Sequence, residues 1–270
     1  MSSFTVLMPT YDRPDLFHLF DKAIDSSLHN SVVPDEIIVV VDGPVSAEFK
    51  LKIKDYESHD LVSVIWLPKN CGLTNALNQG LKAVTTKYVF RADGDDINRP
   101  DRFATQLEML HSGLNLVGSA IIERDIEGKQ LAVKRCPSTH EEIINYCKRR
   151  NPFNHMTVAF DYKAVMSVGG YPDVYLLEDW GLWVLLLESG VVTGNTNKVL
   201  VDATADINMY KRRGGIKMIF SEYAMQKFLI RHLNKNFVVA AFDFIIKGLI
   251  LIAPASLRGF VYRKYLRDSE

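Results

Sequence analysis

The chain has 270 residues, of which 47% are apolar and 24% charged, as expected of a globular protein with a large core. It carries 32 basic and 32 acidic residues, and this zero net charge argues against nucleic acid as a partner. The three cysteines form no C-x-x-C pair, which argues against a zinc site and indicates reduced thiols. The first residues lack the basic and apolar regions of a signal peptide, so we expect a cytoplasmic protein.

Strands and helices are predicted to alternate through the first third of the chain. Short continuous apolar runs are typical of strands buried on both faces, and segments with helical spacing of apolar residues separate them. The predicted strands are 4–9, 36–41, 61–67 and 88–92, and the predicted helices begin at Pro14, Ala47 and Gly72. This order, with short connections, predicts an α/β fold with a Rossmann-like, doubly wound and mostly parallel sheet.

The most informative residues follow the fourth predicted strand. Asp93, Asp95 and Asp96 lie within four residues, and their mutual repulsion is costly unless a cation sits among them. Carboxylate oxygens in a loop suit Mg²⁺ or Mn²⁺ that holds a substrate phosphate. A solvated acidic turn is the alternative interpretation. The other three predicted strands also end at polar or turn residues, where ligands of such sheets bind: Pro9-Thr10-Tyr11, Asp42-Gly43 and Asn70.

The pattern loosens in the second half of the chain. We expect this half to complete the same domain and to form the second side of a cleft. The expected elements are helices at 101–111 and 216–232, strands at 116–122 and 156–160, and an apolar helix from Glu178.

The C-terminal segment 237–255 is the closest match to a membrane-spanning helix, but Asp243 and Lys247 interrupt it. These two residues lie four apart and so share one face, which predicts an amphipathic helix. Basic residues follow at 258, 263, 264 and 267. A helix with such a flank can lie on an anionic membrane, so we expect peripheral membrane contact through 237–267. A helix packed on the body of the protein is the alternative.

Four segments occur in the order seen in family 2 glycosyltransferases, which are inverting enzymes of the GT-A fold. They are TVLMPTY at 5–11, IVVVDG at 38–43, NCGLTNALN at 70–78 and RADGDDI at 91–97. Three others resemble the bacterial surface-polysaccharide branch of that family: DINRPDRF at 96–103, GGY at 169–171 and EDW at 178–180. The resemblance covers about residues 4–215. It implies a GT-A domain at 1–215, with a nucleotide-binding half at 1–98 and an acceptor half at 99–215, and a helical extension at 216–270.

By this resemblance, Asp93 and Asp95 form the D-x-D pair that holds the metal, Mn²⁺ or Mg²⁺, and the ribose or diphosphate of the donor. Asp95 is the chief ligand expected, and Asp96 is expected to share the ion. Arg91 and Arg102 are expected either to order these carboxylates or to touch phosphate, and a salt bridge that supports the loop is the alternative.

The resemblance also assigns the nucleotide side of the site. Asp42 resembles the carboxylate that accepts a hydrogen bond from the base, although an aspartate before a glycine often only forms a turn. Pro9 and Tyr11 resemble the loop that flanks the base. Asn78 is expected in the same pocket, with a polar residue on a helix face as the alternative.

The acceptor side is assigned in the same way. Asp179 is the candidate general base, because an inverting displacement needs one carboxylate to take the proton of the acceptor hydroxyl. Its neighbour Glu178 is expected to orient the acceptor or the loop, and acids that merely stabilise a helix start are the alternative. Further predicted acceptor contacts are His155, Gly170, Tyr171 and Trp180. For His155, contact with the diphosphate and a purely structural role are the alternatives. The basic, glycine-bearing loop 211–215 is expected to close over the diphosphate through Arg212 and Arg213, and a solvated basic turn is the alternative.

These assignments predict an enzyme that moves a hexose, with glucose or galactose favoured, from a UDP-sugar to a hydroxyl of a lipid-linked sugar acceptor. O-antigen, capsular or exopolysaccharide synthesis at the inner face of the bacterial membrane is the expected setting. Two alternatives stay open at this point. One is a non-catalytic sugar-nucleotide-binding protein with a decayed transferase fold. The other is a nucleotidyltransferase, against which the lack of a glycine-rich first loop argues.

Overall fold

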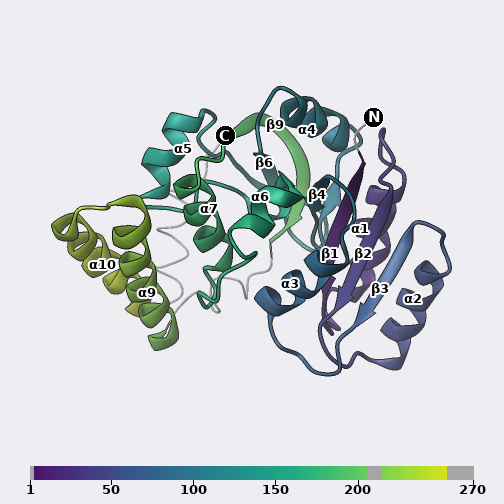
Figure 1. Ribbon diagram of the computed structural model, residues 1–270. Helices are drawn as coiled ribbons and strands as arrows, with labels where there is room; N and C mark the ends of the chain where they lie inside the picture. Colours follow the sequence, from purple (N-terminus) through teal and green to yellow (C-terminus); the bar gives the residue numbers. More distant parts are fainter. Residues whose placement is uncertain (1–2, 206–214, 254–270) are drawn as a thin grey trace.

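A computed structural model of the chain describes residues 3–205 and 215–253 (Figure 1). One sheet runs through it in the order β3-β2-β1-β4-β8-β6-β9-β5, and β7 pairs with β6. The strands are β1 (Phe4–Thr10), β2 (Glu36–Val41), β3 (Val62–Trp66), β4 (Tyr88–Arg91), β5 (Ile97–Asn98), β6 (Leu116–Arg124), β7 (Gln130–Lys134), β8 (Ala159–Asp161) and β9 (Thr193–Thr204). The helices are α1 (Phe20–Leu28), α2 (Ala47–Glu57), α3 (Leu73–Ala83), α4 (Arg102–His111), α5 (His140–Cys147), α6 (Tyr162–Ser167), α7 (Glu178–Glu188), α9 (Ile216–Leu233) and α10 (Phe237–Ile252), with short 3₁₀ turns η1 (Phe17–Leu19) and η2 (His155–Thr157).

The first half of the sheet agrees with the prediction. Strands β1 to β4 are mutually parallel where they pair, and their bounds lie within one residue of those expected from the apolar runs. The helix expected from Pro14 begins later, as η1 and then α1, because residues 13–16 form a turn closed by the Leu16 N–H and the Arg13 carbonyl.

Strands β6, β8 and β9 extend this sheet into the second half. Strand β9 pairs with β6 in parallel over nearly its whole length, whereas β8 runs antiparallel to both β4 and β6. The strand expected at 156–160 is wrong in part, since η2 occupies its beginning and β8 starts at Ala159. The Thr157 hydroxyl donates to the Asn154 carbonyl at 2.8 Å and so stabilises the 3₁₀ turn there.

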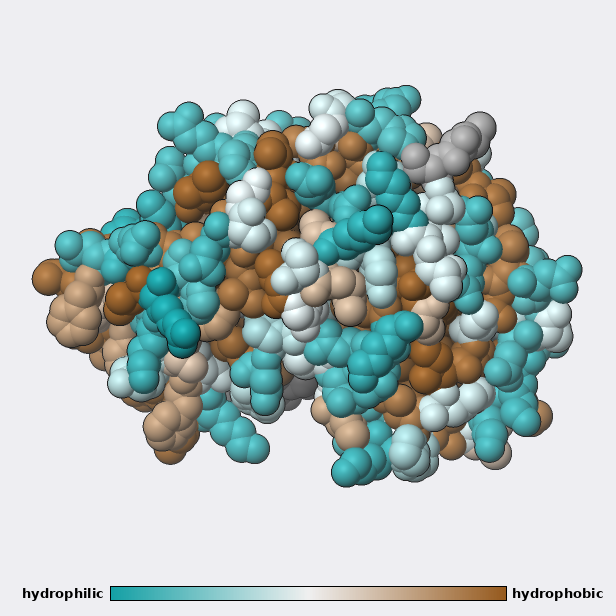
Figure 2. Space-filling view, viewed as in Figure 1, coloured by the Kyte–Doolittle hydropathy of each residue, from teal (hydrophilic) through white to brown (hydrophobic). Residues whose placement is uncertain are grey.

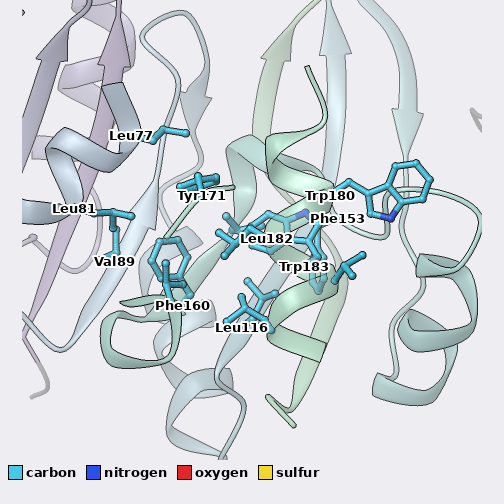
Figure 3. Close-up of a cluster of buried hydrophobic side chains, with 14 of the residues drawn as sticks. Leu77, Leu81, Val89, Leu116, Phe153, Phe160, Tyr171, Trp180, Leu182 and Trp183 are labelled. Atoms are coloured by element: carbon cyan, nitrogen blue, oxygen red, sulfur yellow. The ribbon is translucent and has the colours of Figure 1, made fainter. Parts of the chain in front are cut away.

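Helices cover both faces of the sheet because successive strand residues point to opposite sides. On one face Phe4, Val6 and Met8 of β1 pack with residues of α1, α2 and α4. On the other face Leu7 packs with residues of α3, α6 and α7. Figure 3 shows this second cluster, which joins α3 and β4 of the first half to Trp180, Leu182 and Trp183 of the second. The two halves therefore share one core.

Helices α9 and α10 form a hairpin at the end of the molecule opposite α2 (Figure 1). Met225 and Leu229 of α9 join the shared core. Asn234 makes the turn in the left-handed region, and the Asn236 side chain caps the start of α10. The hairpin begins where the C-terminal extension was expected to begin, and the domain boundary itself stays a prediction. Among the described helices, none is both long and apolar enough to span a bilayer.

A buried ionic cluster joins the two helices of the hairpin and also contacts the body of the protein. The ammonium group of Lys235 lies 2.8 Å from Asp243 Oδ2, and that of Lys247 lies 2.7 Å from Glu222 Oε1. Lys247 Nζ also sits 4.5 Å from the centre of the Trp180 ring on α7, where a cation is attracted to the aromatic face. The hairpin is thus held by specific charged pairs as well as by apolar packing.

Candidate active site

Strand β4 delivers three carboxylates to the edge of the sheet where β1 and β2 also end. Asp93, Asp95 and Asp96 each bring an oxygen within 4.8 Å of the other two. Asp96 Oδ1 accepts the Thr204 N–H at 2.8 Å, while its buried Oδ2 has no hydrogen-bond partner among the described residues. Burial, and then the charge of Asp93, raise the pKa of Asp95 to about 7. Burial and both neighbouring aspartates raise the pKa of Asp96 well above its ordinary value. This orphaned oxygen among clustered carboxylates fits a divalent cation.

Two buried arginines lie behind the acidic cluster. Arg91 pairs with Asp93 at 2.5 Å, and its Nε and Nη1 have no hydrogen-bond partner in the described part of the chain. Arg102 donates to the Arg91 carbonyl at 2.6 Å and to Gln106 Oε1 at 3.0 Å, and also bonds the Asn98 side chain. Burial, and then the nearby charge of Arg91, lower the pKa of Arg102 to about 9. Of the two predicted roles, Arg102 therefore fills the supporting one, because it has no exposed surface with which to touch phosphate.

The ends of β1 and β2 form the predicted nucleotide side. The two carboxylate oxygens of Asp42 accept the N–H groups of Cys71 and Gly72, each at 2.8 Å, and so shape the loop before α3. The Asp42 N–H in turn donates to the Thr10 carbonyl at 2.8 Å, which joins this turn to the end of β1. The turn-forming role is thus present, and contact of Asp42 with a base stays a prediction. Nearby, Pro9 is buried and Tyr11 is exposed.

Asn78 makes contacts across the molecule that the sequence did not predict. Its Nδ2 donates to the Tyr171 carbonyl and its Oδ1 accepts the Tyr171 N–H, both at 2.9 Å. These two bonds fasten α3 to the loop of Gly170 and Tyr171 in the other half of the molecule. Gly170 has φ +78°, and a Cβ there would lie 2.6 Å from Asn78 Oδ1, so the close approach requires glycine. Asn78 therefore braces the two halves against each other, and its contact with the donor stays a prediction.

Helix α7 places the candidate base at its first turn. Asp179 Oδ2 accepts a hydrogen bond from Asn151 Nδ2 at 2.6 Å, and Asp179 Oδ1 accepts the Trp180 N–H at 2.7 Å. Burial, and then the charge of Asp179, raise the pKa of the neighbouring Glu178 to about 7. The sequence reasoning missed Asn151, because its partner lies 28 residues away and no local pattern marks it.

The aromatic side chains predicted to contact the acceptor are buried. Tyr171 and Trp180 were expected to contact the acceptor, but both side chains are buried in the shared core (Figure 3). Trp180 Nε1 donates to the Cys147 carbonyl at 2.9 Å, and the Tyr171 hydroxyl lies 3.0 Å from His155 Nε2. Burial lowers the pKa of His155 well below its ordinary value, so the imidazole is neutral. The apolar surroundings of α7 explain this burial, since an aromatic side chain gains more free energy from burial there than from an exposed position. Contact of these residues with the acceptor stays a prediction.

Tyr171 links the two acidic groups electrostatically. Burial is the main cause that raises the pKa of its phenol, and the charges of Asp179, Glu178 and Asp93 raise it further, while Arg91 lowers it. The acidic cluster after β4 and the acids at the start of α7 therefore lie around one buried residue. The predicted diphosphate contacts Arg212 and Arg213 lie outside the described residues.

Comparison with known proteins identifies the family. Residues 5–171, more than half of the chain, match the model of the family described as glycosyl transferase family 2. The chain belongs to this family. The matched segment contains the acidic cluster, Asp42, Asn78 and Tyr171, whereas Asp179 lies beyond its end.

Full-length relatives agree with the family 2 assignment. UDP-Gal:alpha-D-GlcNAc-diphosphoundecaprenol beta-1,3-galactosyltransferase of Escherichia coli is 36% identical over 98% of this chain and 96% of its own. Amylovoran biosynthesis glycosyltransferase AmsE of Erwinia amylovora is 32% identical over 97% of this chain and 98% of its own. O-antigen biosynthesis glycosyltransferase WbnJ of Escherichia coli is 24% identical over 84% of this chain and 92% of its own. The predictions of a glycosyltransferase enzyme and of the surface-polysaccharide type are thereby confirmed.

Solved structures agree with the fold. Residues 1–349 of S. aureus TarS in complex with UDP-GlcNAc have a TM-score of 0.65 at 15% identity, covering 98% of this chain and 76% of that one. The mannosyltransferase PcManGT from Pyrobaculum calidifontis, in complex with GDP-Man and Mn²⁺, has a TM-score of 0.64 at 15% identity, covering 100% of this chain and 76% of that one. At this identity the likeness concerns the fold alone, and it confirms the predicted α/β architecture of the GT-A type.

Proposed function

We propose that this family 2 enzyme transfers a hexose from a UDP-sugar to a hydroxyl of a lipid-linked sugar acceptor, with inversion at the anomeric carbon. Glucose and galactose are the candidate sugars, and the donor in the name of the 36% identical E. coli relative favours galactose. That name also contains a lipid diphosphate acceptor, and the match spans nearly both chains. The work of the enzyme would take place at the cytoplasmic face of the bacterial membrane.

The observation that carries this proposal is the pairing of two acidic groups around Tyr171. Asp93 of the acidic cluster and Asp179 of α7 both act on this one buried phenol, although they come from opposite halves of the chain. An inverting transfer needs one group of carboxylates at the donor diphosphate and one carboxylate at the acceptor hydroxyl. The two acidic groups would supply both roles.

The donor group of carboxylates would hold a divalent cation, Mn²⁺ or Mg²⁺. Asp95, Asp93 and Asp96 would be its ligands, in keeping with the clustered oxygens and the orphaned Asp96 Oδ2. When bound, the ion would neutralise charge on the departing diphosphate. Arg212 and Arg213 are proposed to contact the same diphosphate.

Asp179 would take the proton of the acceptor hydroxyl while that oxygen bonds to the anomeric carbon and UDP departs from the opposite face. The 2.6 Å bond from Asn151 holds one carboxylate oxygen in place for this step. Glu178 would orient the acceptor or the loop. With its pKa near 7, Glu178 is partly protonated at neutral pH and can then donate a hydrogen bond.

An exposed apolar surface, which we call the hairpin face, supports peripheral membrane contact. It consists of α10 residues at helical spacing on one side of the helix: Val238, Phe242, Ile245, Leu249 and Ile252. On α9, Ile216, Phe220 and Tyr223 are also exposed. Figure 2 shows apolar side chains at this end of the molecule. Such a surface is costly in water and stable in the boundary of a bilayer.

Release of UDP from a panel of UDP-sugars, with Mn²⁺ or EDTA and a lipid-linked acceptor, tests the function. We expect turnover with one hexose, and Asp179→Asn should lower kcat by about 10²- to 10⁴-fold while UDP still binds. Asp173→Asn, in the exposed loop before α7, is the matched control and should leave kcat unchanged. Binding of a UDP-sugar with no turnover on any acceptor would favour the non-catalytic alternative. Equal turnover by Asp179→Asn and wild type would remove Asp179 as the base.

A further inference from the structure

A basic segment directly follows α5. Lys148, Arg149 and Arg150 are consecutive, and both arginines are exposed. The side chain of Arg149 is 60% exposed and lies 3.4 Å from Asp243 Oδ2 on α10. The guanidinium of Arg150 makes no hydrogen bond or ion pair with any residue that the structure describes. The segment therefore presents at least one guanidinium group that no described residue pairs with.

These arginines line an open groove of about 760 Å³ on the outer side of α5. Tyr146 forms part of its wall, and Glu142 is the one acid among its lining residues. The Glu142 carboxylate accepts the N–H groups of Ser138 and Thr139, at 3.1 and 3.0 Å, and these bonds lower its pKa. The start of α5 thus neutralises the Glu142 charge by hydrogen bonds, and Arg150 keeps its charge available for an anion.

The position of the basic segment is fixed on two sides. Asn151, the next residue, donates to the candidate base Asp179 at 2.6 Å, and the Cys147 carbonyl accepts Trp180 Nε1 at 2.9 Å. On the other side Arg149 contacts Asp243 in the middle of α10. The segment therefore lies between Asp179, where the acceptor hydroxyl would react, and α10, whose opposite side carries the apolar hairpin face.

A lipid-linked acceptor has the same order of chemical groups: a sugar, a diphosphate and a long apolar chain. We propose that the groove at Tyr146, Arg149 and Arg150 binds the diphosphate of this acceptor, with the sugar at Asp179 and the chain along the hairpin face. Guanidinium groups suit this ligand because their forked N–H donors match the oxygens of phosphate. This assignment rests on the proposed transfer to a lipid diphosphate acceptor.

Two water-soluble acceptors with the same sugar and the same short alkyl chain test the assignment, one with a diphosphate between them and one without. Wild type should prefer the diphosphate acceptor. The double variant Arg149→Gln/Arg150→Gln should lower kcat/KM for it by about 10- to 100-fold, mainly through KM, as expected for the loss of charged hydrogen bonds. Its kcat/KM for the phosphate-free acceptor and its KM for the donor should not change. Lys54→Gln, an exposed cation on α2 at the opposite end (Figure 1), should change none of these values.

Calorimetric titration of the alkyl diphosphate into the metal-free full-length protein tests the groove without any turnover. We expect weaker binding by the double variant than by wild type and by Lys54→Gln. Equal binding by all three would overturn the proposal, and so would equal kcat/KM of wild type on the two acceptors, while the transferase function would stand. Loss of binding to phosphatidylglycerol vesicles with unchanged acceptor kinetics would also overturn it, because the arginines would then recognise bilayer headgroups. Absence of turnover by wild type, with the expected difference in titration, would refute the transferase function and leave the diphosphate site supported.

Discussion

Replacing Asp95 by asparagine should raise the stability of the metal-free protein and abolish the stabilisation that Mn²⁺ provides. In the metal-free protein burial and Asp93 raise the pKa of Asp95 from 3.8 to about 7. Above pH 7 the folded state therefore holds a carboxylate that ionises far more easily in the unfolded chain. At about 1.4 kcal/mol per pKa unit, the difference between 7 and 3.8 lowers the free energy of unfolding by about 4 kcal/mol. Contact of Asp95 with water reduces this loss of stability to about 2 kcal/mol.

Asp95→Asn removes this cost, so in EDTA at pH 8 the variant should unfold about 4 °C above wild type, at about 2 °C per kcal/mol for a chain of this size. The gain has a defined pH dependence. A carboxyl group with a raised pKa favours the folded state below its unfolded-state pKa, and this advantage disappears as the pH rises through the folded-state pKa. The stability gain of the variant should thus be largest at pH 8 and shrink by roughly half or more at pH 5.

The same substitution removes the chief predicted metal ligand. Wild type with Mn²⁺ at 100 times its dissociation constant should gain about 2.7 kcal/mol, or about 5 °C, and the variant should gain almost nothing. Thermal unfolding by calorimetry, with EDTA and then with Mn²⁺, measures both effects in one experiment. Asp60→Asn, at an exposed loop position, is the control and should show neither. A variant less stable than wild type in EDTA, or one that keeps the full Mn²⁺ gain, would refute this reasoning.

Two further substitutions test the brace and the hairpin face. Gly170→Ala should lower the unfolding temperature about 2 °C more than Gly169→Ala. Both positions have positive φ, but only a Cβ at Gly170 would displace the Asn78 amide that bonds the loop to α3. The loss of this contact should cost about 1 kcal/mol of stability. Equal temperatures would mean that this tie contributes nothing. The double variant Phe242→Ser/Leu249→Ser should weaken sedimentation with phosphatidylglycerol vesicles about 30-fold, from about 2 kcal/mol of lost apolar burial. Leu51→Ser, at a position of similar exposure on α2, should not, and unchanged sedimentation of the double variant would refute membrane contact through this face.

The nucleotide half was predictable because its strands carry their own signal. Strand β2 is continuous in apolar residues and is buried on both sides, so a local pattern suffices. Strand β9 carries no such pattern, since it begins with polar residues such as Asn195 and Thr196 and is held by its pairing with β6. Pairings between distant segments do not appear in a local window, which explains why β9 and the short strands β5 and β7 were not expected.

The candidate site divides in a similar way. The acidic cluster was predictable because three carboxylates lie together in the sequence. The brace between Asn78 and Tyr171 joins residues 93 apart, so the same residues that a motif suggested as ligand contacts proved to hold the two halves together. The burial of Trp180 was missed for a related reason: the motif places it next to Asp179, the candidate base, but the next helical position points into the core.

The charged pairs within the hairpin have a consequence for orientation. Ions buried in pairs tolerate few alternative arrangements, so these pairs hold α9 and α10 in one arrangement. The contacts of Lys247 with Trp180 and of Arg149 with Asp243 then join that arrangement to the body of the protein. A protein that rests on a bilayer through the hairpin would then keep Asp179 at a constant height above the lipid surface. Such a fixed height would select acceptors by the distance between their membrane anchor and the hydroxyl to be modified.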